Sequence, residues 1–213
     1  MAKMIRVLIV DDHAIVRQGL TQIIRAWNNQ VIFKESASGR EAISIVSSGK
    51  FDLVLLDITL SDTHGIDVLK HMKNVRPDMG VIMLSMHPEE LYALRALKAG
   101  ASGYLTKSCN ASDLIDAIEK VSSGRKYITP AVVQLMVDDL NRSKGSLPHE
   151  VLSDREYQIL CMIGQGKRVK DIADNLGLSA KSVSTYRNRV LHKLKMRTNE
   201  QLSSYARNLH LID

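Results

Sequence analysis

A short apolar run at residues 51–57 (FDLVLLD) constrains the fold of this chain more than any other feature. Four apolar residues without alternation stand between two aspartates, and the run is too short for a free-standing helix. Such a run is typical of a parallel β-strand that is buried on both faces of a sheet. The run ends on Asp57 and is followed by a polar loop. Because ligands bind at the carboxyl ends of the strands in open α/β sheets, Asp57 is placed like a reactive carboxylate.

Four further segments have a strand pattern, and a helical pattern follows each of the five strands. The strands are expected at residues 4–10, 30–37, 51–57, 81–85 and 102–106, and the helices at 13–27, 39–48, 65–74, 89–99 and 112–122. Strands that alternate with helices indicate a parallel sheet with helices on both faces. We therefore predict an α/β fold with a doubly wound, parallel, five-stranded sheet over residues 1–124.

Beyond Gly124 the strand pattern disappears, and the rest of the chain is expected to be helical. Helices are expected at residues 130–140, 153–164, 169–176, 180–194 and 199–208, with a polar linker at 141–150. A chain of 213 residues has the length of two domains. The predicted division is residues 1–124 for the α/β domain, 125–149 for a helix and linker, and 150–213 for a small all-α domain.

Charge is divided unevenly between these parts. Residues 1–124 contain 14 Lys and Arg against 14 Asp and Glu, whereas residues 125–213 contain 15 against 9 and carry the whole net charge of +6. A neutral domain joined to a basic one suggests a controlling domain attached to a domain that binds an anion. Two cysteines without metal-ligand spacing, Cys109 and Cys161, favour a reduced cytoplasmic protein. No apolar run approaches membrane-spanning length, so we expect no membrane partner.

Polar residues at the ends of the expected strands should meet at one edge of the sheet. They are Asp11, Asp12, Asp57, Ser85 and Lys107. Three neighbouring carboxylates repel one another, and oxygen ligands favour Mg²⁺ as the cation that relieves the repulsion. An aspartate can accept a phosphoryl group, and Lys107 and the Ser85 hydroxyl could hold its oxygens. Each residue alone has an ordinary alternative, such as an aspartate pair that caps a helix, but five such residues at the strand ends of one sheet favour a site.

The helix expected at residues 180–194 has two distinct faces. Its buried stripe consists of Val183, Val190, Leu191 and Leu194. Another face, with i, i+3, i+4, i+7 spacing, consists of Lys181, Ser184, Thr185 and Asn188. Six Lys and Arg, among them Arg187 and Lys193, and no acidic residue lie between positions 181 and 197. A charged run is often only a solvated face, but a preceding helix and glycine turn indicate a helix-turn-helix that binds double-stranded DNA.

Residues from about 4 to 123 resemble the receiver domain of two-component response regulators, which has a flavodoxin-like fold. The matching residues are Asp11, Asp12, Asp57, Ser85, Tyr104 and Lys107. The resemblance implies that Asp57 accepts a phosphoryl group from a sensor histidine kinase. It also implies that Asp11, Asp12, Asp57 and the backbone carbonyl of Thr59 bind Mg²⁺. Phosphorylation would draw Ser85 toward the phosphoryl group and let Tyr104 turn inward.

This chain has three departures from the receiver pattern. Members often carry proline soon after the phosphoacceptor and directly after the lysine, where this chain has Ser61 and Ser108. The third departure is Thr59 and His87 beside the site, and we expect these two residues to set the lifetime of the phosphoryl group.

Residues 152–212 resemble the LuxR-type (GerE-like) DNA-binding domain. The shared motifs are LSxRE, KDIAxxL, LSxKSVSTY and LxKL. The resemblance implies that the face with Lys181, Ser184, Thr185 and Asn188 contacts the major groove, and that the helix from Asn199 helps to pair two domains. Together the two resemblances have the order of the NarL/FixJ class of response regulators. They predict a transcriptional regulator that forms a homodimer when it is phosphorylated.

Two other classes of function share the same residues. A haloacid-dehalogenase-like phosphatase also uses an aspartate nucleophile, but it needs a second Asp two residues later, where this chain has Thr59. We therefore expect no enzyme. A phosphate-independent adaptor or transcription factor stays open, and phosphorylation with a small phosphodonor and Mg²⁺ would separate it from the phosphorylation-dependent regulator.

Overall fold

The computed structural model describes residues 4–141, 147–209 and 211–212. The chain separates into two compact units, Met1–Val137 and Asp138–Asp213, so the division falls inside the helix α6 (Pro130–Asn141). Residues 142–146, in the middle of the predicted linker, lie outside the described residues.

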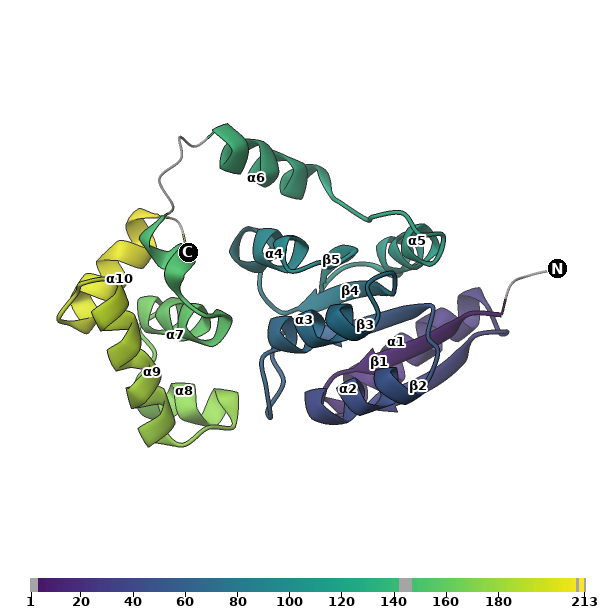
Figure 1. The fold of residues 1–213 in the computed structure, drawn as a ribbon, viewed down its shortest axis with the longest axis horizontal. Helices are drawn as coiled ribbons and strands as arrows, with labels where there is room; N and C mark the ends of the chain where they lie inside the picture. The colour runs from purple at the N-terminus through teal and green to yellow at the C-terminus, as the bar shows by residue number, and fades with distance from the viewer. Residues whose placement is uncertain (1–3, 142–146, 210, 213) are drawn as a thin grey trace. The chain divides into compact units, whose positions relative to one another are not determined.

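A parallel sheet of five strands forms the centre of the first unit (Figure 1). The strands are β1 (Arg6–Val10), β2 (Ile32–Ser36), β3 (Leu53–Asp57), β4 (Gly80–Ser85) and β5 (Gly103–Thr106). Their order across the sheet is β2-β1-β3-β4-β5, and every neighbouring pair is parallel. The predicted doubly wound α/β fold is confirmed, and all the strands begin and end within two residues of their expected positions.

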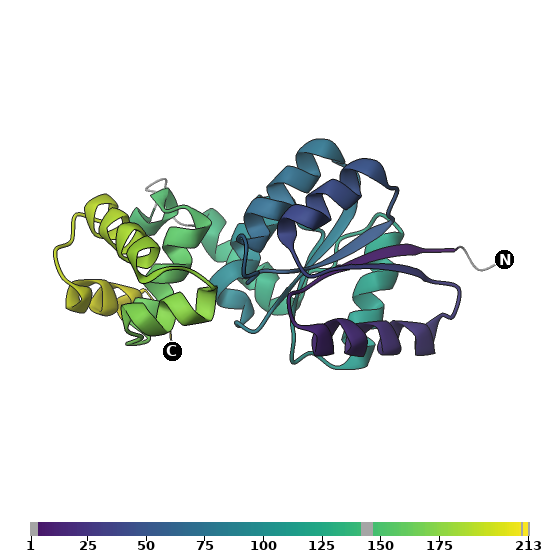
Figure 2. The same ribbon diagram turned by 90° about the horizontal axis from the view of Figure 1, so that it is seen from below.

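Five helices alternate with these strands, as the sequence pattern predicted. They are α1 (Ala14–Trp27), α2 (Gly39–Ser48), α3 (Gly65–Val75), α4 (Glu89–Lys98) and α5 (Ala111–Ser122). Helices α1 and α5 lie on one face of the sheet, and α2 and α3 lie on the other (Figure 2). Helix α4 packs along β5.

Strand β3 explains why residues 51–57 are apolar without alternation. It lies between β1 and β4, and the side chains of Leu53, Val54, Leu55 and Leu56 are all 0% exposed. Leu53 and Leu55 belong to the core that the sheet forms with α1 and α5. Because successive side chains of a strand point to opposite faces, Val54 and Leu56 face the side of α2 and α3.

The segment between α5 and α6 returns to the sheet. The Tyr127 N–H donates to the Ser102 carbonyl at 2.8 Å, and Tyr127 forms a parallel bridge with Gly103. At the beginning of α6, the Thr129 hydroxyl donates to Glu89 in the first turn of α4. These contacts attach the first residues of the predicted helix-and-linker segment to the α/β unit.

The second unit contains four α-helices and one short 3₁₀ helix among its described residues. They are η1 (Pro148–Val151), α7 (Asp154–Gly164), α8 (Val169–Leu176), α9 (Ala180–Lys193) and α10 (Asn199–Asn208). The α-helices agree with prediction to within one residue, whereas η1 falls partly in the predicted linker. Helix α7 packs against α9 and α10, and α8 packs against α9. Gly177 ends α8 with φ of +60°, a conformation that favours glycine, and so forms the turn that leads into α9.

Local sequence signals set the ends of these helices. Ser153 and Glu156 form the predicted capping box of α7, in which the Ser153 N–H donates to Glu156 at 2.8 Å. Ser179 caps α9 by accepting from the Ser182 N–H at 3.0 Å. No helix in the described part of the chain is long and apolar enough to cross a membrane.

Candidate functional site

The order of the strands brings the predicted acidic residues to one edge of the sheet. Val10 pairs with Leu56, so Asp11 follows β1 directly beside the end of β3. Strand β4 flanks β3 on its other side and ends on Ser85. Beyond it, the Lys107 N–H donates to the Ser85 carbonyl at 2.7 Å. Asp57 therefore lies between the ends of β1 and β4, and Lys107 follows β5 on the far side of β4.

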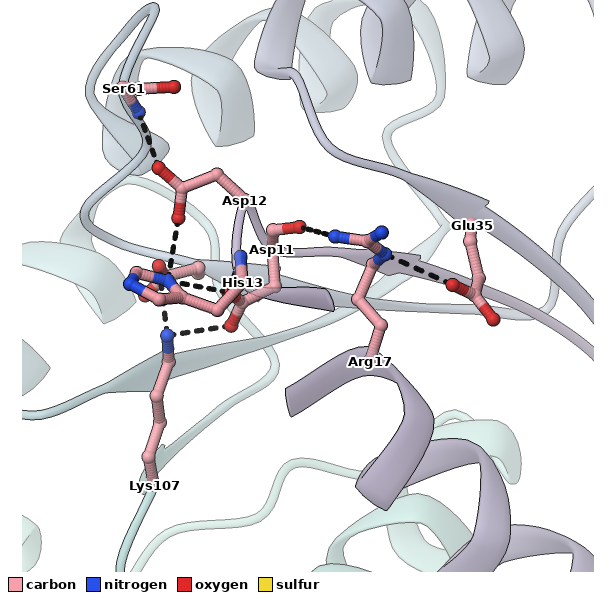
Figure 3. A network of polar contacts seen from close by, with 8 residues as sticks. Asp11, Asp12, His13, Arg17, Glu35, Ser61 and Lys107 are labelled. Carbon is pink, nitrogen blue, oxygen red and sulfur yellow. Dashed lines mark hydrogen bonds and ion pairs between the residues drawn. The ribbon is translucent and has the colours of Figure 1, made fainter. Parts of the chain in front are cut away.

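Lys107 connects two buried carboxylates. Its Nζ lies 2.6 Å from Asp11 Oδ2 and 2.9 Å from Asp57 Oδ2, and Figure 3 shows the Lys107 side chain directed at Asp11. Asp11 is 0% exposed and Asp57 is 2% exposed. Burial lowers the pKa of Lys107, but Asp57 and Asp11 outweigh burial and raise that pKa above its ordinary value. Lys107 is therefore a fixed positive charge in the pocket.

Asp57 has the electrostatic properties of a functional carboxyl group. Burial raises its pKa to about 6; Lys107 opposes this shift, Asp11 adds to it, and the Thr59 N–H lowers the pKa slightly. At neutral pH the group is still mainly ionised. Strongly shifted pKa values of this kind, with a specific charged partner, are concentrated at functional sites.

The same pocket is compatible with a divalent metal ion. Asp11, Asp12, His13 and Asp57 each offer one ligand atom, and these atoms lie within 4.8 Å of one another. The buried oxygens Asp11 Oδ2 and Asp57 Oδ2 lie 2.6 Å and 2.9 Å from Lys107 Nζ, and Asp12 Oδ1 lies 2.8 Å from His13 Nδ1. Three carboxylates in one cluster fit a hard cation that prefers oxygen ligands.

His13 belongs to this cluster although its sequence position alone gave no reason to include it. Its Nδ1 lies 2.8 Å from Asp12 Oδ1 and 3.2 Å from Asp11 Oδ1, and its side chain is 69% exposed. Arg17 also contributes, because its guanidinium donates to the Asp11 carbonyl at 2.7 Å and to Glu35 at 3.0 Å (Figure 3). The loop after β3 contributes a backbone donor, since the Ser61 N–H donates to Asp12 Oδ2 at 3.1 Å. The carbonyl of Thr59 stays a predicted ligand.

Ser85 and Tyr104 meet at the loop between β4 and α4. The Ser85 Oγ accepts from the His87 N–H at 3.0 Å, and the Tyr104 hydroxyl donates to the His87 carbonyl at 3.0 Å. Tyr104 is only 2% exposed, so its ring is buried in this structure. Burial raises the pKa of Tyr104, which keeps its hydroxyl a donor.

Helix α9 has the two faces that its sequence predicted. The stripe of Val183, Val190, Leu191 and Leu194 is confirmed as buried. Lys181, Thr185 and Asn188 are exposed, and Ser184 is half-buried. A shallow depression along the exposed side is lined by Thr185, Asn188, Arg189, His192 and Lys193. This face is polar and open, as an interface with DNA requires.

Two of the predicted DNA contacts also bind other helices of their own unit, which sequence reasoning missed. The Lys193 Nζ lies 2.6 Å from Glu156 Oε2 and 3.2 Å from the Val151 carbonyl, so it connects α9 to the capping box of α7. Arg187 donates to Asn199 at the beginning of α10 and to Asn188 at 3.2 Å. Both cations therefore have structural contacts in addition to the predicted contacts with DNA.

Comparison with known proteins gives matches for both units. Residues 7–119 match the response regulator receiver domain, and residues 150–206 match the bacterial regulatory proteins of the luxR family. Response regulator GacA of Pseudomonas viridiflava is 33% identical over 211 residues, which cover 99% of this chain and 99% of GacA. Response regulator UvrY of Escherichia coli (strain K12) is 33% identical over 204 residues, which cover 95% of this chain and 94% of UvrY.

A solved structure is similar to the chain over a shorter length. It is the crystal structure of a two-component response regulator of the LuxR family from Aurantimonas sp. SI85-9A1, with 32% sequence identity and a TM-score of 0.59. The similarity covers 65% of this chain and 99% of that one.

Proposed function

Because the chain belongs to the response regulator family, with a receiver domain followed by a luxR-family DNA-binding domain, we propose that Asp57 is its phosphoacceptor and a sensor histidine kinase its phosphodonor. The observation that carries this proposal is the Lys107 ammonium, which lies between Asp57 and Asp11 beside the acidic cluster. A buried nucleophile, a fixed cation and a set of metal-compatible oxygens together favour phosphoryl transfer. A phosphatase with Asp57 as its nucleophile would need an aspartate two residues later as general acid, and this chain has Thr59 there.

In the proposed reaction, an ionised Asp57 oxygen attacks the phosphorus of a phosphohistidine. A P–O bond forms, the P–N bond breaks, and the imidazole leaves with the electron pair of that bond. Lys107 stabilises the charge that develops on the phosphoryl oxygens. Mg²⁺, held by Asp11, Asp12, Asp57 and the Thr59 carbonyl, would neutralise further charge on those oxygens. The protein itself receives the phosphoryl group, so we assign it as a regulator and not as an enzyme.

The signal then passes through Ser85. A Ser85 hydroxyl that turns to the phosphoryl group gives up its bond from the His87 N–H, and the Tyr104 hydroxyl is bonded to the carbonyl of the same residue. The loop that precedes α4 therefore changes with the state of Asp57. This is a local electrostatic change with an effect on a larger surface.

The output of the proposed mechanism is DNA binding in the cytoplasm. Lys181, Ser184, Thr185 and Asn188 on α9 would contact base edges, while Arg187 and Lys193 would supply charge toward phosphates. A single helix-turn-helix has a small interface, and two copies on paired half-sites bind more tightly. We therefore propose that phosphorylation controls homodimerisation and, through it, promoter binding.

Intact-mass spectrometry tests the acceptor. The full-length protein, treated with a small phosphodonor and Mg²⁺, should gain one phosphoryl group that is lost in base. Asp57→Asn should remove this gain and leave the fold intact, because the two side chains are nearly isosteric. Asp67→Asn, on α3, is the matched control and should be labelled like wild type. Undiminished labelling of Asp57→Asn would transfer the acceptor role to another carboxylate, with Asp12 tested next.

A further inference from the structure

We propose that the Thr129 hydroxyl is a positioning group that couples helix α6 to the phosphorylation state of Asp57 through its hydrogen bond with Glu89. The inference rests on the proposed function, because it concerns how a change at Asp57 leaves the receiver domain. The Thr129 hydroxyl donates to Glu89 Oε2 in α4 and accepts from the Val132 N–H in α6 at 3.3 Å. One hydroxyl thus caps the beginning of α6 and binds the beginning of α4.

The Glu89 end of this bond lies directly after the loop that a turn of the Ser85 hydroxyl would change. Helix α4 begins at Glu89, four residues after Ser85. Between them, the His87 N–H donates to the Ser85 Oγ, and the His87 carbonyl accepts from the Tyr104 hydroxyl, both at 3.0 Å. Pro88 follows, and its fixed φ removes one of the few dihedral angles that could absorb a displacement. A shift at His87 is therefore passed on to Glu89.

The other end of the segment before α6 is attached to the sheet. The Tyr127 N–H donates to the Ser102 carbonyl at 2.8 Å, and Tyr127 forms a parallel bridge with Gly103 of β5. The Lys120 Nζ of α5 lies 5.2 Å from the centroid of the Tyr127 ring, which adds a cation–π contact. Because Tyr127 is attached to the sheet and Thr129 to α4, a displacement of α4 relative to the sheet changes the direction in which α6 begins.

Helix α6 can carry this change away from the sheet. Its first turn is held in place, since Val132 is only 2% exposed. The helix has 12 residues, a length of about 18 Å, so a small rotation at its first turn becomes a larger displacement at its last. The boundary between the two units falls within α6, after Val137. The helix is therefore the covalent path from the receiver domain to the rest of the chain.

Hydrogen exchange of the full-length protein, with and without acetyl phosphate and Mg²⁺, tests the coupling. Mass spectrometry of peptides that cover residues 130–137 should show exchange rates that differ by about 5-fold or more between the two states of wild type. Thr129→Val keeps the shape of the side chain but loses the hydroxyl, so exchange should become faster in both states and the difference between them should disappear. Thr129→Ser keeps the hydroxyl and should keep the wild-type difference. Intact-mass spectrometry should show equal phosphorylation of all these proteins, because Thr129 lies outside the acidic pocket.

Glu89→Ala separates the coupling from the cap of α6. It removes the acceptor but leaves the Thr129 hydroxyl to cap α6, and it should also abolish the difference between the two states. Glu90→Ala is the matched control, because it removes an exposed acid from the same first turn of α4 and should keep the difference.

Three results would overturn the inference. The first is equal exchange of phosphorylated and unphosphorylated wild type over residues 130–137. The second is a wild-type difference that persists in Thr129→Val or Glu89→Ala. The third is a loss in Thr129→Ser or Glu90→Ala as large as in the variants that break the bond. A wild-type protein that gains no phosphoryl group would overturn the proposed function, and the inference with it.

Discussion

The Asp57 carboxyl group combines a reactive position with a cost in stability. Its pKa is about 6 in the folded protein, against an ordinary value of 3.8. Between these values the folded protein binds the proton more tightly than the unfolded chain does. The stabilisation is therefore complete below pH 4 and is lost as pH rises through 6. The buried negative charge of Asp57 is unfavourable in the protein alone, and a bound cation would stabilise it.

This linkage predicts a specific dependence on pH. Without divalent cations, the unfolding free energy of wild type relative to Asp57→Asn should fall by about 2 kcal/mol between pH 4 and pH 7. Urea denaturation of both proteins at several pH values, followed by the fluorescence of Trp27 in α1, measures the difference. Asp52→Asn, outside the pocket, controls for a general effect of removing a carboxylate. A difference that is constant with pH, or that increases, would contradict the shifted pKa of Asp57.

At the same scale, the sequence allowed side chains to be predicted but not backbone donors. Asp11, Asp57 and Lys107 were predictable because parallel strands end at one edge of a sheet, and their chemistry is complementary there. The Ser61 N–H was not, because every residue except proline has this donor and only the path of the loop directs it at Asp12. His13 was missed for a related reason: its position after the aspartates gives no direction for its ring.

Among the helices, α9 carries the proposed DNA contacts and also contacts that hold its own unit together. Lys193 contacts Glu156, which is largely buried and also accepts from the Ser153 N–H. Lys193→Ala should lower the unfolding free energy of the second unit by about 1–2 kcal/mol, because it removes the partner of a buried carboxylate. The exposed Lys181 at the other end of α9 is the matched control. Lys181→Ala should weaken DNA binding and reduce the salt dependence without a change in stability.

Urea denaturation and DNA-binding isotherms at several salt concentrations separate the two lysines. Equal stability of Lys193→Ala and wild type would mean that the contact with Glu156 contributes nothing measurable. The boundaries of the helices were predictable because caps such as Ser153–Glu156 are local in sequence. The contact between Lys193 and Glu156 joins residues 37 positions apart in two helices, and no local pattern encodes it.

At the scale of the whole molecule, residues 1–124 are neutral and residues 125–213 are basic. This division predicts that the first part controls the second. An unphosphorylated receiver domain would either mask the DNA-binding domain or fail to dimerise, and in both cases phosphorylation of Asp57 should raise affinity for a two-fold DNA site. A fragment of residues 147–213 lacks the receiver domain and should bind the same duplex whether or not phosphodonor is present.

The measurement compares the full-length protein, with and without phosphodonor, the Asp57→Asn variant and the fragment on one duplex at one salt concentration. Asp57→Asn should behave like unphosphorylated wild type under both conditions, because it lacks the acceptor. If phosphodonor left the affinity of full-length protein unchanged while mass spectrometry confirmed the phosphate on Asp57, the two domains would not be coupled. That result would favour the phosphate-independent adaptor, in which the receiver domain binds partner proteins and its phosphorylation does not control DNA binding.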